Sequence, residues 1–129
     1  MKEIDIKTVS SSALAYLGDS VMEGCVREYL VREGLSSSAH LNEAALRFVR
    51  ASEQAKAMKN IMDVLTEEEA AVYRRGRNVG HTSTPKSASV SEYRTATGME
   101  ALFGYLHLAG REERIRTLFA AGYGLSDES

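Results

Sequence analysis

Apolar residues recur at helical spacing along most of the chain, and this pattern predicts an all-α protein. The first such segment covers 11–33, where apolar residues three or four positions apart are Leu14, Leu17, Val21 and Cys25. A serine at 10, 11 or 12 can cap its start, and Gly34 can end it because glycine tolerates a left-handed backbone. We therefore expect one long first helix.

Further helical segments follow, separated by residues that cap helices or break them. The serines at 36–38 precede an apolar pattern over 41–65 that predicts one or two helices. Thr66 and Glu69 match a capping box, so a helix should run from there towards Asn78. Residues 80–89 contain the only proline and predict a loop. A buried helix is expected from about Val90 to Gly110, then a last helix over 112–123 and an acidic tail.

Length and composition indicate one globular domain in a reducing compartment. The 129 residues, 43% of them hydrophobic, suffice for one core, so a single domain is expected over 1–129. The one cysteine, Cys25, cannot form an intramolecular disulfide. The N-terminus has no signal-peptide core, and no segment is long enough to span a bilayer. We therefore expect a cytoplasmic protein with no membrane partner.

The position of the charges is more informative than their sum. The 16 basic and 18 acidic residues give a net charge of −2, which argues against a protein that is basic throughout. Between 74 and 94, however, five basic residues oppose one acidic residue, a local charge of +4. The basic residues are Arg74, Arg75, Arg77, Lys86 and Arg94. This segment is a candidate for contact with an acidic partner.

Asp19 follows Gly18 inside the first predicted helix, where both residue types are unfavourable. A glycine there permits close approach of another helix, and an aspartate beside it is then available to bind a cation. The alternative is an aspartate on the wet face of an amphipathic helix.

Glu100 is the only residue of 96–109 that is charged at neutral pH, and its neighbours are apolar. A buried, unpaired carboxylate is costly, so Glu100 must be paired, protonated, metal-bound or turned outwards. No residue three or four positions away supplies a cation. A salt bridge to a distant arginine and a metal site both fit this pattern.

Carboxylates on two different helices are a typical start for a magnesium site, because Mg²⁺ takes oxygen ligands and keeps several waters. In phosphodiester hydrolysis such an ion activates water and stabilises the charge that develops on phosphate oxygens. Glu23, one turn after Asp19, is in position to orient such a water, with an ordinary surface glutamate as the alternative. The spacing of His40, His81 and His107 argues against zinc.

Two fragments together carry a resemblance to a known family. Leu17-Gly18-Asp19-Ser20-Val21 and Met99-Glu100-Ala101-Leu102-Phe103-Gly104 resemble the paired signature of ribonuclease III catalytic domains. The run Arg74-Arg75-Gly76-Arg77-Asn78, followed by Pro85-Lys86 and Tyr93-Arg94, is similar to the Mini-ribonuclease III subgroup. The match extends over nearly the whole chain.

The resemblance implies an all-α endonuclease domain that forms a homodimer with one metal-dependent site in each subunit. Asp19 and Glu100 would be the catalytic, metal-binding carboxylates, with Mg²⁺ as the cofactor and Mn²⁺ as a substitute. The implied reaction is cleavage of double-stranded RNA by metal-activated water, which leaves a 5′-phosphate. The implied substrate is the 23S ribosomal RNA precursor, with a ribosomal protein that aids substrate folding as a further partner.

Two positions depart from the larger ribonuclease III pattern. Ala15 stands where those enzymes have a glutamate, and Thr97 stands where they have an aspartate. The Mini-ribonuclease III subgroup shares this reduced set, so catalysis is still expected, but the number of metal ions is left open. Thr97 can offer its hydroxyl to a metal-bound water or bond its own backbone.

The larger relatives append a double-stranded RNA-binding domain, and we expect this chain to hold RNA without one. Duplex RNA is recognised mainly through phosphates and 2′-hydroxyls. The expected RNA-binding residues are Arg74, Arg75, Arg77, Asn78, Lys86 and Arg94, with His81 as a further hydrogen-bond donor.

Two other functions stay open at this point. A non-catalytic double-stranded RNA-binding module of the same fold would keep the basic segment but not the activity. A helical protein-interaction domain would use that segment for an acidic protein and would pair Glu100 with an arginine.

Overall fold

The computed structural model describes residues 1–79 and 89–125, and these residues form helices and connecting turns without a strand. The elements are η1 (Ile6–Thr8), α1 (Ser11–Arg32), α2 (Ser38–Val49), α3 (Ala51–Ile61), η2 (Met62–Val64), α4 (Glu67–Arg77), α5 (Val90–Leu108) and α6 (Glu112–Tyr123). The expected all-α fold is confirmed, and the pattern over 41–65 forms two α-helices and a short 3₁₀ turn. Residues 80–88 of the loop expected over 80–89, and the end of the acidic tail, lie outside the described residues.

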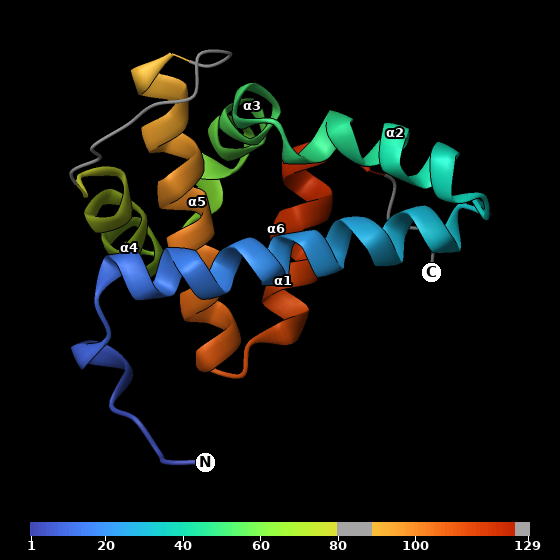
Figure 1. The fold of residues 1–129 in the computed structure, drawn as a ribbon. Helices are drawn as coiled ribbons and strands as arrows, with labels where there is room; N and C mark the ends of the chain where they lie inside the picture. The colour runs from blue at the N-terminus through green and yellow to red at the C-terminus, as the bar shows by residue number, and fades with distance from the viewer. Residues whose placement is uncertain (80–88, 126–129) are drawn as a thin grey trace.

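Helix α5 is the centre of the arrangement, and α1, α3, α4 and α6 all pack against it. Figure 1 shows α1 crossing in front of α5, with α4 on one side and α2 continuing from the far end of α1. The apolar sequence of α5 follows from this position, because a helix covered on several sides buries most of its circumference. None of the helices in the described ranges is long and apolar enough to cross a membrane.

The helix ends follow local capping signals. The Ser10 side chain accepts a hydrogen bond from the Ala13 amide at 3.1 Å, and so begins α1. Thr66 with Glu69, and Ser89 with Glu92, form complete capping boxes at the starts of α4 and α5. Gly34 (φ +94°) and Gly110 (φ +74°) adopt the left-handed conformation just beyond α1 and α5. These local rules explain why the helix boundaries lie close to the predicted ones.

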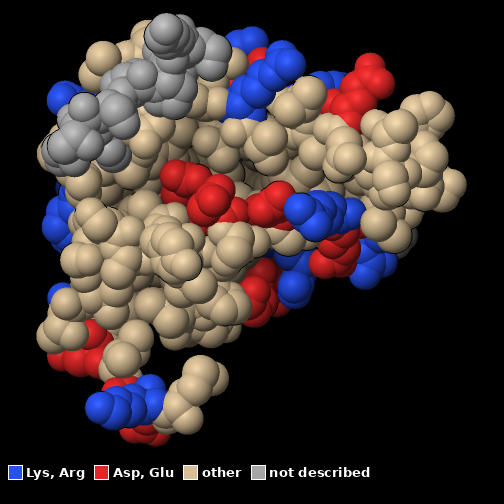
Figure 2. Space-filling view, viewed as in Figure 1, with Lys and Arg blue, Asp and Glu red and all other residues tan. Residues whose placement is uncertain are grey.

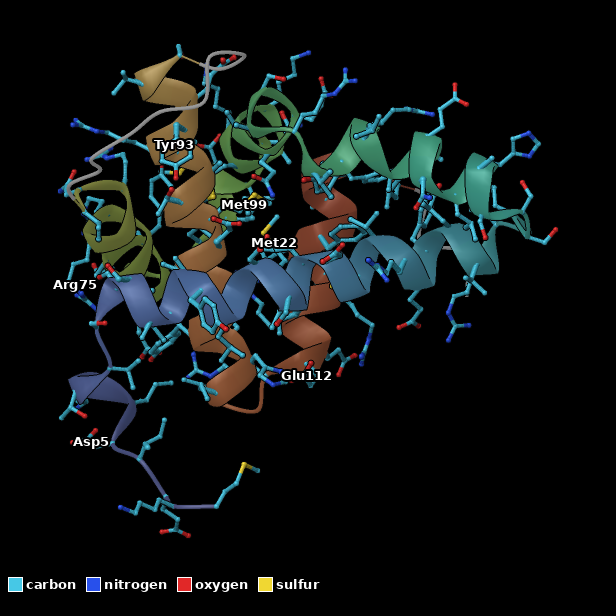
Figure 3. All side chains as sticks on the ribbon, in the orientation of Figure 1. Asp5, Met22, Arg75, Tyr93, Met99 and Glu112 are labelled. Atoms are coloured by element: carbon cyan, nitrogen blue, oxygen red, sulfur yellow. The ribbon has the colours of Figure 1, made fainter. Side chains whose placement is uncertain are left out.

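The core lies between α5 and the helices around it. Met22 of α1 and Met99 of α5 are buried in it, and Figure 3 shows both side chains between the two helices. Cys25 packs against the same core, and burial raises the pKa of its thiol to about 11. Gly18 of α1 is also buried within the subunit, whereas Tyr16 of the same helix is exposed.

Helices α1 and α5 cross in direct backbone contact. A Cβ atom built on Gly18 would lie 1.6 Å from the Glu100 carbonyl oxygen, and one built on Gly104 would lie 2.0 Å from the Leu14 carbonyl oxygen. Neither position has space for a side chain, and the obstacle is backbone, which cannot rotate away. A Cβ atom built on Gly24 of α1, by contrast, would meet no neighbouring atom within 4 Å.

We predict that Gly104→Ala destabilises the fold by about 3 kcal/mol, because the methyl group forces α1 and α5 apart. Gly24→Ala is the matched control, and it should be neutral or stabilising by up to about 1 kcal/mol, since alanine favours the helix. Urea unfolding monitored by circular dichroism measures both. Equal midpoints for Gly104→Ala and wild type would contradict the close crossing.

A buried ion pair joins α4 to α6. Glu69 is 2% exposed, and its two carboxylate oxygens accept hydrogen bonds from Arg114 at 2.8 and 2.9 Å. One of these oxygens also accepts from the Thr66 amide at 2.9 Å, while Arg114 donates to the Val64 carbonyl. The Arg114 hydrogen bond holds the pKa of Glu69 below its usual value, despite the opposing effect of burial.

We predict that Arg114→Met destabilises the protein by about 3–5 kcal/mol, because it leaves the Glu69 carboxylate buried without a cation. A lowered folded-state pKa stabilises the fold at pH values above the unfolded glutamate value of about 4.3, and this stabilisation is lost as pH falls. The wild-type free energy of unfolding should therefore decrease more steeply between about pH 5 and 3 than that of Arg114→Met. Parallel slopes in urea titrations across that range would contradict the assignment.

Candidate functional site

Asp19 and Glu100 lie in one open pocket, although 80 residues separate them in the sequence. The pocket has a volume of about 530 Å³ and lies where α1, α3 and α5 meet. Figure 2 shows acidic side chains beside a hollow on this face of the molecule. The lining residues are Ser12, Ala15, Tyr16, Asp19, Val49, Ala51, Gln54, Val79, Tyr93, Ala96, Thr97 and Glu100.

The glycine crossing brings the two carboxylates together. Gly18 lies against the backbone of Glu100, so the next residue of α1, Asp19, is placed beside the Glu100 side chain. The unfavourable Gly18–Asp19 pair in a helix interior is explained by this contact. Glycine allows the approach, and the acidic residue follows it into the pocket.

The pair is electrostatically uncompensated in the described part of the chain. Burial, a hydrogen bond with Asp19 and the charge of Asp19 raise the pKa of Glu100 to about 8. No lysine or arginine within 1–79 and 89–125 forms an ion pair with either carboxylate. The salt bridge to arginine that the sequence allowed for Glu100 is absent from these residues. Asp19 is exposed, as the alternative interpretation expected, but it faces the pocket rather than open solvent alone.

The donor set fits a hard divalent cation. Two carboxylates that share a hydrogen bond repel each other once both are ionised, and a divalent ion between them removes that repulsion. The described residues contain no cluster of three or more acidic, histidine or cysteine ligands. Water and substrate oxygens would therefore complete the coordination, as is common for Mg²⁺.

Two auxiliary residues follow their ordinary structural interpretations. Glu23 accepts a hydrogen bond from Arg27 at 2.8 Å and does not line the pocket, so it is a surface ion pair rather than a residue that orients water. Thr97 does line the pocket, but its hydroxyl donates to the Tyr93 carbonyl at 2.9 Å. Its hydroxyl is therefore used by its own helix.

Several of the basic residues lie on the α4 side of the pocket that contains Asp19 and Glu100, which we call the carboxylate pocket. Arg77, Asn78 and Arg94 line a second pocket of about 300 Å³ between the end of α4 and the start of α5. Val79, next in the chain, lines the carboxylate pocket, so the two pockets are adjacent.

The remaining basic residues are less closely placed. Arg74 and Arg75 are exposed on α4, and Figure 3 shows Arg75 near the start of α1. Arg77 lies over the Tyr73 ring, with its guanidinium carbon 5.8 Å from the ring centroid. Lys86 and His81 lie outside the described residues.

The sequence interpretation missed Gln54 of α3. This residue is 6% exposed and lines the carboxylate pocket. Its position could have been noticed, because Met58 and Ile61 follow at helical spacing on the same apolar face. The charged neighbours Glu53 and Lys56 made the segment look like an ordinary polar surface.

Comparisons with known proteins agree with this architecture. The model of the ribonuclease III domain family matches residues 12–111. The Mini-ribonuclease 3 of Symbiobacterium thermophilum is 46% identical over 114 residues, which is 88% of each chain. The Mini-ribonuclease 3 of Enterococcus faecalis is 42% identical, again over 88% of each chain.

A solved structure has the same fold. The crystal structure of a Fusobacterium nucleatum protein superposes with a TM-score of 0.80 and 33% sequence identity, covering 89% of this chain and 92% of that one. The all-helical domain described above is thus the fold of a known class of ribonucleases. The chain belongs to the ribonuclease III family, in its Mini-ribonuclease III branch.

Proposed function

We propose that this protein is a magnesium-dependent endoribonuclease that cuts double-stranded RNA, with Asp19 and Glu100 as its catalytic, metal-binding carboxylates. The observation that carries the proposal is the convergence of these two side chains in one pocket, where no described cation compensates them. Family membership supplies the class of reaction. The donor set supports Mg²⁺, with Mn²⁺ as a substitute of similar ligand preference.

The chain's own residues hold the reacting groups in place. Asp19 and Glu100 would bind the cation through their carboxylate oxygens. The close crossing of α1 and α5 fixes the spacing between these two residues. When bound, the cation would lower the pKa of a water molecule and stabilise the charge that develops on the phosphate. Ala15, Val49 and Ala96 form an apolar part of the pocket lining beside these two carboxylates.

The residues Arg77, Asn78 and Arg94 form a basic border beside the carboxylate pocket, and this border would hold the RNA backbone close to the carboxylates. Arg77, Asn78 and Arg94 offer hydrogen-bond donors around one pocket, while Arg74 and Arg75 extend the positive surface along α4. Lys86 belongs to the same proposed set, from the segment outside the described residues. Phosphate contacts of this kind give affinity without reading sequence.

The biological setting is proposed from the same family resemblance. We infer a cytoplasmic homodimer that acts on the 23S ribosomal RNA precursor, with a ribosomal protein aiding substrate folding. The names of the Mini-ribonuclease 3 relatives support the ribonuclease assignment. The exposed Tyr16 side chain, at 87% exposure, remains available on α1 for a subunit contact.

We predict that Asp19→Asn and Glu100→Gln each lower kcat/KM on duplex RNA by about 1,000-fold or more, because each removes one charge that holds the cation. The control is Glu23→Gln, one turn after Asp19 but paired with Arg27, and it should stay within about twofold of wild type. Chelation should abolish wild-type cleavage, and added Mg²⁺ or Mn²⁺ should restore it. Cleavage by Asp19→Asn at the wild-type rate would refute the site.

We predict that Arg77→Ala and Arg94→Ala weaken duplex RNA binding and each reduce the slope of log Kd against log salt by about 1, through loss of one phosphate contact. Arg32→Ala, which removes an exposed arginine paired with Glu28 at the far end of α1, should leave affinity and slope unchanged. Fluorescence anisotropy between about 50 and 200 mM salt measures both. Equal slopes in all three variants would exclude this border as the RNA contact.

A further inference from the structure

Gln54 differs from the other buried polar side chains of the described residues. Those residues bury three such side chains, Gln54, Glu69 and Thr97. Glu69 is held by Arg114, and Thr97 by its own helix. The side-chain amide of Gln54 has no hydrogen-bond partner within the protein, in the part of the chain that the structure describes. Buried polar groups in folded proteins are nearly always hydrogen-bonded, so an amide of this kind requires an explanation.

The pocket that contains the carboxylates supplies the explanation. Gln54 lies near the start of α3 and lines the same pocket as Asp19 of α1 and Glu100 of α5. Gln54 is therefore the polar residue that α3 presents to an open space of about 530 Å³, a volume typical of ligand sites, which α1 and α5 also line with polar residues. Water can satisfy the amide while the pocket is empty of ligand. A ligand that displaces this water must take over its hydrogen bonds.

We propose that Gln54 is an RNA-binding residue of this site, and that its amide hydrogen-bonds the ribose 2′-hydroxyl of a nucleotide beside the scissile phosphate. This inference rests on the proposed function. An amide carries both a donor and an acceptor, and a 2′-hydroxyl also does both, so the two groups can pair fully. A phosphate oxygen only accepts and would leave the Gln54 carbonyl without a partner.

The chemistry of the pocket gives Gln54 a role distinct from that of the carboxylates. A neutral amide adds no charge, so it contributes little to the binding of a cation beside Asp19 and Glu100. It contributes instead to choosing ribose over deoxyribose, because a buried polar group that meets no hydroxyl is left unpaired. Gln54 thus positions the sugar while the carboxylates act on the phosphate.

The test compares wild type and Gln54→Met, which keeps the shape of the side chain but removes the amide. Each cuts two duplexes: one all-ribose, and one with 2′-deoxyribose at the nucleotides flanking the bond that wild type cleaves. Gln54→Met should raise KM on the ribose duplex about 3- to 10-fold with little change in kcat, as expected for a contact made equally in the ground and transition states. The deoxyribose substitution should raise the KM of wild type by a similar factor. It should hardly raise the KM of Gln54→Met any further.

Stability separates this role from a structural one. Gln54→Met should melt at or above the wild-type temperature, because no protein hydrogen bond is lost. Asn60→Ala is the matched control on α3, since the Asn60 amide donates to the Gly122 carbonyl at 2.8 Å. It should melt at a lower temperature than wild type and discriminate between the two duplexes as wild type does.

Two results would overturn this inference while leaving the proposed function intact. One is a Gln54→Met enzyme with wild-type KM. The other is an equal loss on both duplexes, which would assign the amide to a phosphate or to the fold. Because the comparison is a ratio of two substrates within each variant, a partly unfolded sample does not change it. Failure of wild type to cut the ribose duplex with Mg²⁺ would instead overturn the proposed function.

Discussion

Helices α1 and α5 touch backbone to backbone, and the candidate site depends on that contact. Gly18 and Gly104 leave no space for a Cβ atom at the crossing, so the helices approach more closely than side chains permit. Asp19 follows Gly18, and Glu100 supplies the carbonyl against which Gly18 packs. Because close-packed interiors transmit small changes in volume, a methyl group at this crossing would move both carboxylates. Stability and site geometry are therefore determined by the same residues.

Close placement of two carboxylates opposes folding in the absence of a cation. Glu100 has its pKa raised to about 8 by burial and by Asp19, so the metal-free pair holds a proton that two separated carboxylates would lose. The compensating stability lies elsewhere, in the core around α5 and in the Glu69–Arg114 pair between α4 and α6. An unfavourable electrostatic arrangement at a functional site, with the compensating stability outside it, is common in enzymes.

Local chemistry explains how much of the fold could be predicted from the sequence. The starts of α1, α4 and α5 depend on side chains within three residues, such as Ser10 and the Thr66–Glu69 capping box, and these are visible in the sequence. The break between α2 and α3 was uncertain because Arg50 makes no side-chain cap. The 3₁₀ turn Ile6–Thr8 was not predicted, since it buries no residue.

The candidate site was only partly predictable, because its residues meet through tertiary packing. Both carboxylates could be singled out, Glu100 as the acidic residue in an apolar helix and Asp19 by its position after Gly18. That they lie close together could be predicted only from the family resemblance. Gln54 was missed because a neutral amide between charged residues resembles a solvated helix face. Its burial follows from α3 packing against α5, which no local pattern reveals.

A chain with a net charge of −2 can bind a polyanion when its charges are separated in space. Exposed charges are largely screened beyond about 8 Å at physiological salt, so the acidic residues distant from the site hardly affect an RNA strand there. In the proposed complex, the strand would meet the border with Arg77 and Arg94, which is joined through Val79 to the carboxylate pocket. Phosphates held at the basic border would direct the next stretch of backbone towards the two carboxylates, where a bound cation would offset the repulsion between carboxylate and phosphate. Cation binding and RNA binding at this pocket should therefore be mutually favourable, because each supplies the charge that the other requires.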